Sequence, residues 1–156
     1  MYGAGAAKIG SIVNGSAKEG EELIQNFLRE VPKLAKLKKR IAANMKKLDN
    51  KLPALDGRLL EVRSEHSALN TLLQSAGAVV AKQWLVEIHK QLEIEGIEVK
   101  QVAMVHDECE FECKAEDAQR VLDICIESAT KAGEILGMRC RVDADGDIGT
   151  TWYDVH

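Results

Sequence analysis

Apolar residues recur at helical spacing in five stretches of the chain, which cover residues 6–13, 17–30, 32–48, 65–95 and 115–136. In the third stretch they follow one another every three or four positions, so that they share one side of a helix while lysines line the other. Ser16 followed by Glu19 predicts a capping box at the start of the second helix, and Pro32 favours the first turn of the third. The pattern therefore predicts several long helices.

Shorter runs predict β-strands, at residues 51–55, 58–63, 99–105, 109–113 and 139–144. The first two flank Asp56-Gly57, a dipeptide typical of a two-residue hairpin turn. The next two are joined by His106-Asp107-Glu108. Together with the helices they indicate an α+β fold, in which the second hairpin and the C-terminal strand form a small antiparallel sheet packed against long helices.

Length and composition fit one domain of 156 residues with 46% hydrophobic content. No apolar run approaches the ~20 residues that a membrane span needs, and no signal peptide opens the chain, so we expect a cytoplasmic protein without membrane contact. None of the four cysteines forms a CxxC pair, and Cys109 and Cys113 on one strand lie too far apart for a disulfide. We therefore expect four reduced thiols.

Charge is distributed unevenly along the chain, although the net charge is only −4. Residues 33–47 contain no acid, and their cations are Lys33, Lys36, Lys38, Lys39, Arg40, Lys46 and Lys47. Such a helix is either a solvated surface helix or a face that attracts nucleic-acid phosphates. A membrane-surface helix is disfavoured because the stretch lacks aromatic residues.

Two adjacent carboxylates, Asp107 and Glu108, lie at the predicted hairpin turn. The preceding apolar residues 102–105 are expected to be buried, and a buried strand is a rigid support for an oxygen ligand. Hard cations such as Mg²⁺ prefer carboxylate oxygens. From the residues alone, a metal site and a solvated acidic turn remain equal alternatives.

Several motifs occur in the order found in family A DNA polymerases, the polymerase I group. Val105-His106-Asp107-Glu108 resembles motif C of that family, and Asp56-Gly57-Arg58 with the segment 63–76 resembles its long palm helix and the preceding hairpin. The opening Tyr2-Gly3-Ala4-Gly5 resembles the segment after motif B, and Gly149, Trp152 and His156 resemble the family's C-terminus. The resemblance covers the whole chain, and the most similar branch is the replicative polymerases of short-tailed phages.

The resemblance implies roles for individual residues. Asp107 would be one of two aspartates that hold the catalytic Mg²⁺ ions, Glu108 a nearby carboxylate ligand, and His106 a contact to the primer end. Asn70 and Gln74 would reach the minor groove of primer–template DNA, where every base pair presents acceptors. The other implied DNA contacts are His66, Arg63 and His156. Transfer of a nucleotide from a dNTP to the primer would be the reaction.

Two motifs of the family, the motif A aspartate and the motif B residues that grip the dNTP, have no match in the chain. We therefore expect an incomplete palm, with residues 1–50 or so from the helical region between fingers and palm, that is inactive alone. It would need an N-terminal polymerase fragment, or else self-associate through an open sheet edge. A split gene and a truncation are both compatible with this, and the alternative function is an inactive DNA-binding or regulatory fragment.

Overall fold

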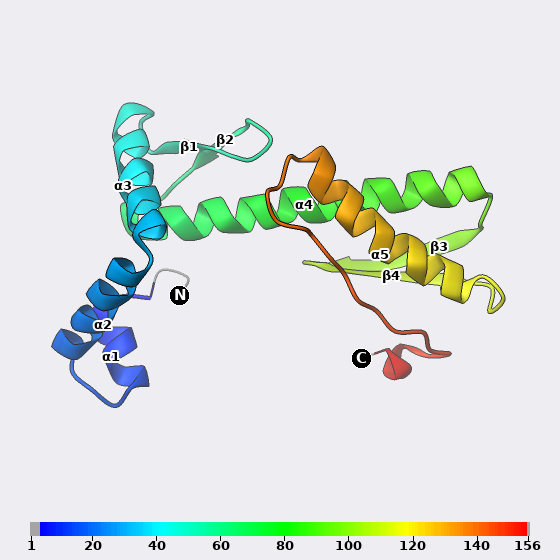
Figure 1. Cartoon of the computed structure of the whole chain (residues 1–156), viewed down its shortest axis with the longest axis horizontal. Helices are drawn as coiled ribbons and strands as arrows, with labels where there is room; N and C mark the ends of the chain where they lie inside the picture. Colours follow the sequence, from blue (N-terminus) through cyan, green and yellow to red (C-terminus); the bar gives the residue numbers. More distant parts are fainter. Residues whose placement is uncertain (1–3, 156) are drawn as a thin grey trace. The chain divides into compact units, whose positions relative to one another are not determined.

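The computed structural model describes residues 4–155, which form an α+β fold of helices and two small antiparallel sheets (Figure 1). The helices are α1 (Ala6–Ile12), α2 (Ala17–Glu30), α3 (Pro32–Lys47), α4 (Glu65–Glu95), α5 (Ala118–Ile135) and the short 3₁₀ helix η1 (Trp152–Asp154). The strands are β1 (Lys51–Pro53), β2 (Leu59–Glu61), β3 (Val99–Val105) and β4 (Glu108–Cys113). The chain divides into two compact units, residues 1–76 and 77–156, and each is described by itself.

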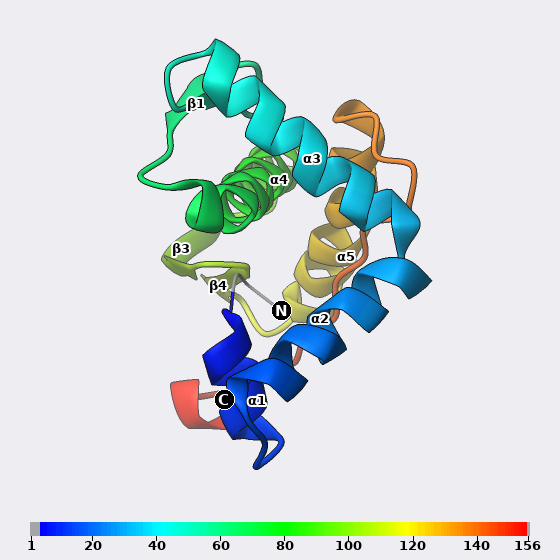
Figure 2. The same ribbon diagram turned by 90° about the vertical axis from the view of Figure 1, so that its left-hand side faces the viewer.

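Two glycines allow α1 and α2 of the first unit to pack closely. A side chain at Gly10 or Gly20 would meet backbone atoms of the neighbouring segment, so only glycine fits at this crossing. The predicted capping box is confirmed: the Ser16 hydroxyl accepts a hydrogen bond from the Glu19 amide, and the Glu19 carboxylate accepts one from the Ser16 amide. The chain then bends between α2 and α3, where Pro32 opens the new helix (Figure 2).

The core of the first unit lies between α3, the β1–β2 hairpin and the start of α4. Its buried residues are Ile41, Met45, Leu52, Val62 and Ala68. The two-residue turn expected at Asp56-Gly57 is wrong, because Pro53 pairs with Leu59 and five residues form the loop. The amide of Ala54 and the carbonyl of Arg58 close this longer loop at 2.8 Å.

The second unit packs residues 77–95 of α4 and all of α5 around the β3–β4 hairpin. Its core residues are Ile88, Leu92, Val121 and Ile124, with Trp84, Ile97, Val99, Phe111, Cys113 and Cys125 packed against them. The Trp84 indole Nε1–H donates to the Cys125 carbonyl at 2.7 Å, which links α4 to α5. Helix α5 begins at Ala118 and not at 115, because turns at residues 114–118 precede it.

The strand predicted at residues 139–144 is wrong. This segment bends at residues 139–140 and pairs with no strand in the described part of the chain, and it lies along α5 instead. Thr130 donates its hydroxyl hydrogen to the Val142 carbonyl at 3.1 Å, and the Val142 side chain occupies the space above Gly133. Further on, Gly146 approaches Leu122, so the tail retraces α5 toward its N-terminal end (Figure 1).

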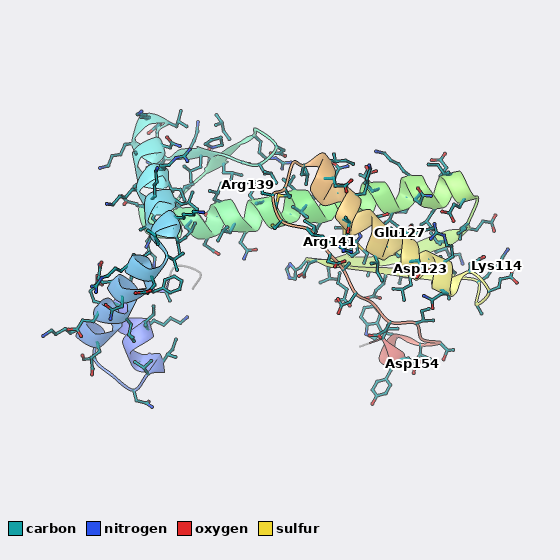
Figure 3. All side chains as sticks on the ribbon, viewed as in Figure 1. Lys114, Asp123, Glu127, Arg139, Arg141 and Asp154 are labelled. Carbon is teal, nitrogen blue, oxygen red and sulfur yellow. The ribbon has the colours of Figure 1, made fainter. Side chains whose placement is uncertain are left out.

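The tail ends in a turn that is fixed by one carboxylate. Asp154, labelled in Figure 3, accepts hydrogen bonds from the amides and hydroxyls of Thr150 and Thr151 at 2.8 to 3.0 Å. This capping places Trp152 and Tyr153 in η1, and Tyr153 is 89% exposed.

The expected state of the cysteines is confirmed. All four cysteines are free thiols, as predicted. Within residues 4–155, no helix combines the length and the apolar character that crossing a bilayer requires. The expected burial of residues 102–105 is wrong in part, because Val102 is 60% and Val105 51% exposed. Val102 lies at the bulge of β3, outside the paired register, and the residues of the hairpin that pack against the core of α4 and α5 are Val99, Phe111 and Cys113.

Candidate active-site hairpin and nucleic-acid contacts

The β3–β4 turn is fixed by the pairing of the two strands. Val105 pairs with Glu108 and Met104 with Cys109, so His106 and Asp107 alone form the loop. The loop is thus one residue shorter than the tripeptide 106–108 predicted from the sequence. Asp107 lies at its tip with an exposed side chain.

The backbone of His106 has φ 57°, in the left-handed region, whereas Asp107 does not have a positive φ. A two-residue hairpin loop with positive φ at its first position has the φ pattern of a type II′ turn, where glycine is usual. Histidine tolerates this region better than most side chains, but still at some cost. Such strained positions cluster at functional sites, which makes the turn a candidate site.

His89 of α4 supports the hairpin from the side of the helix. Its Nε2 lies 2.9 Å from Oε1 of Gln101 in β3, and its ring meets the ring of Phe111 in β4 edge-on, with centroids 5.9 Å apart. Gln101 and Phe111 are themselves paired across the strands. One side chain therefore contacts both strands just before the bulge at Val102, where β3 has one residue more than β4.

The carboxylates of Asp107 and Glu108 are the donors that the turn offers to a cation. Carboxylate oxygens are the ligands that Mg²⁺ prefers, so the type of donor fits. The number of donors does not: within residues 4–155, no three or more His, Cys, Asp or Glu side chains are arranged to hold a metal ion. A complete site with these two carboxylates would need further ligands.

The polar stripe predicted on α4 lies in the first unit. His66 and Gln74 are exposed, and Asn70, between them, is partly buried. The helix starts with Ser64, whose hydroxyl accepts from the Ser67 amide at 3.3 Å. Arg63 precedes this cap and is exposed.

Asn70 has an unsatisfied atom. Its Oδ1 is buried and has no hydrogen-bond partner in the described part of the chain. A buried acceptor without a partner costs about 1–3 kcal/mol, so retaining it calls for an explanation. Gly5 lies near the same stripe, since a Cβ there would be 3.9 Å from Cε1 of His66.

The predicted site residues therefore form two groups. His106, Asp107 and Glu108 share the turn in the second unit, and Arg63, His66, Asn70 and Gln74 share the start of α4 in the first. His156, Tyr2 and Gly3 lie outside the described residues. Sequence reasoning missed His89, because a single histidine on a polar helix face carries no signal. It also missed the positive φ of His106, which a glycine at this position would have indicated.

The comparison with known proteins gives the same family for nearly the whole chain. A sequence model of DNA polymerase family A matches residues 1–154. The DNA-directed DNA polymerase of Escherichia phage T7 is 35% identical over 100% of this chain, and that of Escherichia phage Phieco32 is 38% identical over 99%. The chain spans 25% and 26% of the length of these two relatives.

A solved structure supports the fold. The chain is similar to the POL domain of Pol1 from M. smegmatis, in complex with DNA primer-template and dNTP, with a TM-score of 0.73 and 18% identity. The likeness covers 84% of this chain and 25% of that one, and it agrees with the predicted α+β class. Because the family model matches all but the last two residues, the chain belongs to DNA polymerase family A.

Proposed function

We propose that this chain supplies the C-terminal part of the palm of a template-directed DNA polymerase, with the β3–β4 turn as its motif C. Asp107 holds catalytic Mg²⁺, Glu108 lies beside it, and His106 contacts the primer end. Mg²⁺ held there would supply charge stabilisation and orientation of oxygens for the transfer of a nucleotide from a dNTP to the primer 3′-hydroxyl.

The observation that carries the proposal is the exposed Asp107 carboxylate at the tip of a two-residue turn. The register of the two strands fixes the position of this turn, and His89 holds the hairpin further along, at the Gln101–Phe111 pair. A carboxylate held by paired strands keeps its direction when a ligand binds, which metal-dependent catalysis requires. Membership of family A supports nucleotidyl transfer as the reaction that this turn serves.

The start of α4 provides the contacts to primer–template DNA in this proposal. The amide groups of Asn70 and Gln74 donate to the minor-groove acceptors that all base pairs share, so they detect pair shape and not sequence. His66 and Arg63 bind near the DNA backbone, and His156 belongs to the same set of contacts.

The incomplete donor set motivates a partner. In the described part of the chain β3 and β4 form a sheet of two strands, so each strand has an edge to which a further strand could pair. We assign this strand to an N-terminal polymerase segment that brings the second aspartate and the residues that grip the dNTP. Without it the chain is inactive and can self-associate through the same edge.

A chimera tests the proposed function. Residues 1–156 replace the matched quarter of the phage T7 relative, and primer extension is measured beside the isolated chain. The chimera is expected to extend primers and the isolated chain is not. Asp107→Asn in the chimera should lower the rate at least ~100-fold, because losing even an outer-sphere partner of a metal ligand typically costs ~10–100-fold.

The matched control is Asp147→Asn, which removes the same charge from an exposed tail position. It should leave primer extension within a factor of about two. A folded chimera that binds primer–template DNA but never extends it would support the alternative of a DNA-binding or regulatory fragment. Extension by the isolated chain would refute the partner requirement.

A further inference from the structure

A basic face on α3 has no role in the site described so far. Its cations are Lys33, Lys36, Lys39, Arg40, Lys46 and Lys47, and all are exposed. They lie opposite the apolar side of the helix, where Ile41 and Met45 are buried in the core of the first unit. The face is therefore fixed in direction by the packing of the helix.

These cations have no acidic partner in the described part of the chain. Within residues 4–155 no α3 side chain of this set forms an ion pair or a side-chain hydrogen bond, whereas Lys90 and Arg120 in the second unit pair with glutamates. Like charges three or four positions apart, such as Lys36 with Lys39 and Arg40, destabilise a helix. An anionic partner removes this repulsion.

A hollow beside the face extends the basic surface to a second helix. It has a volume of about 360 Å³ and is lined by Gln25, Leu28 and Arg29 of α2 and by Ala35, Lys38 and Lys39 of α3. Cations from two helices thus converge on one concave surface, with the Gln25 amide as a further polar group.

We propose that the α3 basic face and this hollow bind the phosphodiester backbone of DNA, as a contact separate from the Asn70 and Gln74 stripe. The face runs ~21 Å along the helix, the length of DNA axis over which one strand carries about six phosphates. Helix α3 has no aromatic residue on which bases could stack, so the contact is to phosphates and independent of sequence. Its buried apolar side cannot enter a lipid surface. The inference rests on the proposed polymerase function.

Salt-dependent binding of the full chain to a labelled DNA duplex tests the proposal. The variant K36Q/K39Q/R40Q is expected to bind more weakly on two unrelated sequences, with a log–log salt slope less steep by ~2–3. The charge-preserving variant K36R/K39R/R40K should bind like the parent. The matched control K18Q/K82Q/K114Q removes three exposed cations that form no ion pairs within residues 4–155, and its slope should stay near that of the parent. Circular dichroism confirms folding of each variant.

Further measurements distinguish failure of this inference from failure of the proposed polymerase function. A single strand of equal length is expected to bind with a shallower slope, because single strands release fewer counterions per contact. Three results would each overturn this inference. The first is an equal salt slope for K36Q/K39Q/R40Q and the control, and the second is displacement of the duplex by polyglutamate as effectively as by DNA. The third is a parent chain that does not bind the duplex. The proposed function is judged separately by the chimera, and by N70A/Q74A, which should weaken binding without changing the slope.

Discussion

Val105 pairs with Glu108 across the end of the β3–β4 hairpin, and this pairing makes His106 and Asp107 the two residues of the turn. A shift of the register by one residue would move Asp107 into a strand and turn its side chain toward a face of the sheet. The position of the carboxylate is therefore set by the backbone, and variants of the turn can be tested apart from variants of the carboxylate.

The positive φ of His106 predicts different effects of two substitutions on stability. His106→Gly should leave the free energy of unfolding within about 1 kcal/mol of the parent, because glycine adopts φ 57° freely. His106→Val should lower it by roughly 1–2 kcal/mol, since a β-branched residue is strained there. Urea unfolding of both variants measures the difference, and equal stabilities would show that the turn does not hold this φ in solution.

Asn70 is predicted to serve DNA binding at the expense of stability. Asn70→Ala should raise the free energy of unfolding by about 1 kcal/mol, because it removes the unsatisfied Oδ1 and favours the helix. The same variant should weaken primer–template binding. Gln74→Ala, at an exposed position, is the control that weakens binding with less than ~0.5 kcal/mol change in stability. A marked loss of stability in Asn70→Ala would mean that Oδ1 has a partner.

The ion pair between Glu95 and Arg120 predicts a pH dependence. Hydrogen bonds donated by the Arg120 guanidinium, and then by Gln91, lower the pKa of Glu95 from 4.5 to about 2. A lowered folded-state pKa stabilises the fold above the unfolded value, and this stabilisation is lost as the pH falls from about 4.5 to about 2.

Thermal unfolding from pH 7 to pH 2 checks this sign. Glu95→Gln should be less stable than the parent at pH 7, and the difference should shrink toward zero at the acid end. Glu93→Gln removes the same charge from α4 without breaking an ion pair and is the control. A difference that grows on acidification would contradict the assignment.

Burial predicts an order of cysteine reactivity. Burial, and then the nearby Cys109 and Cys113 thiols, raise the pKa of Cys125 to about 12, so little thiolate forms near neutral pH. Cys140 is exposed. Iodoacetamide at pH 8 should therefore modify Cys140 first and Cys125 last, as followed by mass spectrometry. Rapid modification of Cys125 in the folded protein would show that α5 opens readily.

The sequence predicts those elements whose signals are local. The α2 and α4 bounds follow from helical spacing and from Ser16, and the β3 bounds from a run of seven strand residues. The tail at residues 139–144 reads as a strand, but Thr130 and Gly133 of α5 bind it instead, and such a long-range contact leaves no pattern in the segment itself.

The candidate site also combines local features that the sequence predicts with long-range contacts that it does not. The Asp107-Glu108 pair is visible in the sequence because two acids follow an apolar run. The exposure of Val102 and Val105 is not visible, because the same apolar run suits a covered strand and an open one. The support from His89 depends on α4 lying against β3 and β4, which only the fold reveals.

The most direct test of the central claim counts metal ions in the assembled protein. Mn²⁺, as a paramagnetic substitute for Mg²⁺, is titrated into the chimera with primer–template DNA and dNTP, and bound ions are counted by electron paramagnetic resonance. Two ions are predicted for the parent and for Asp147→Asn, and weaker or incomplete binding for Asp107→Asn. Unchanged binding of both ions by Asp107→Asn would contradict the claim that this turn holds the metal.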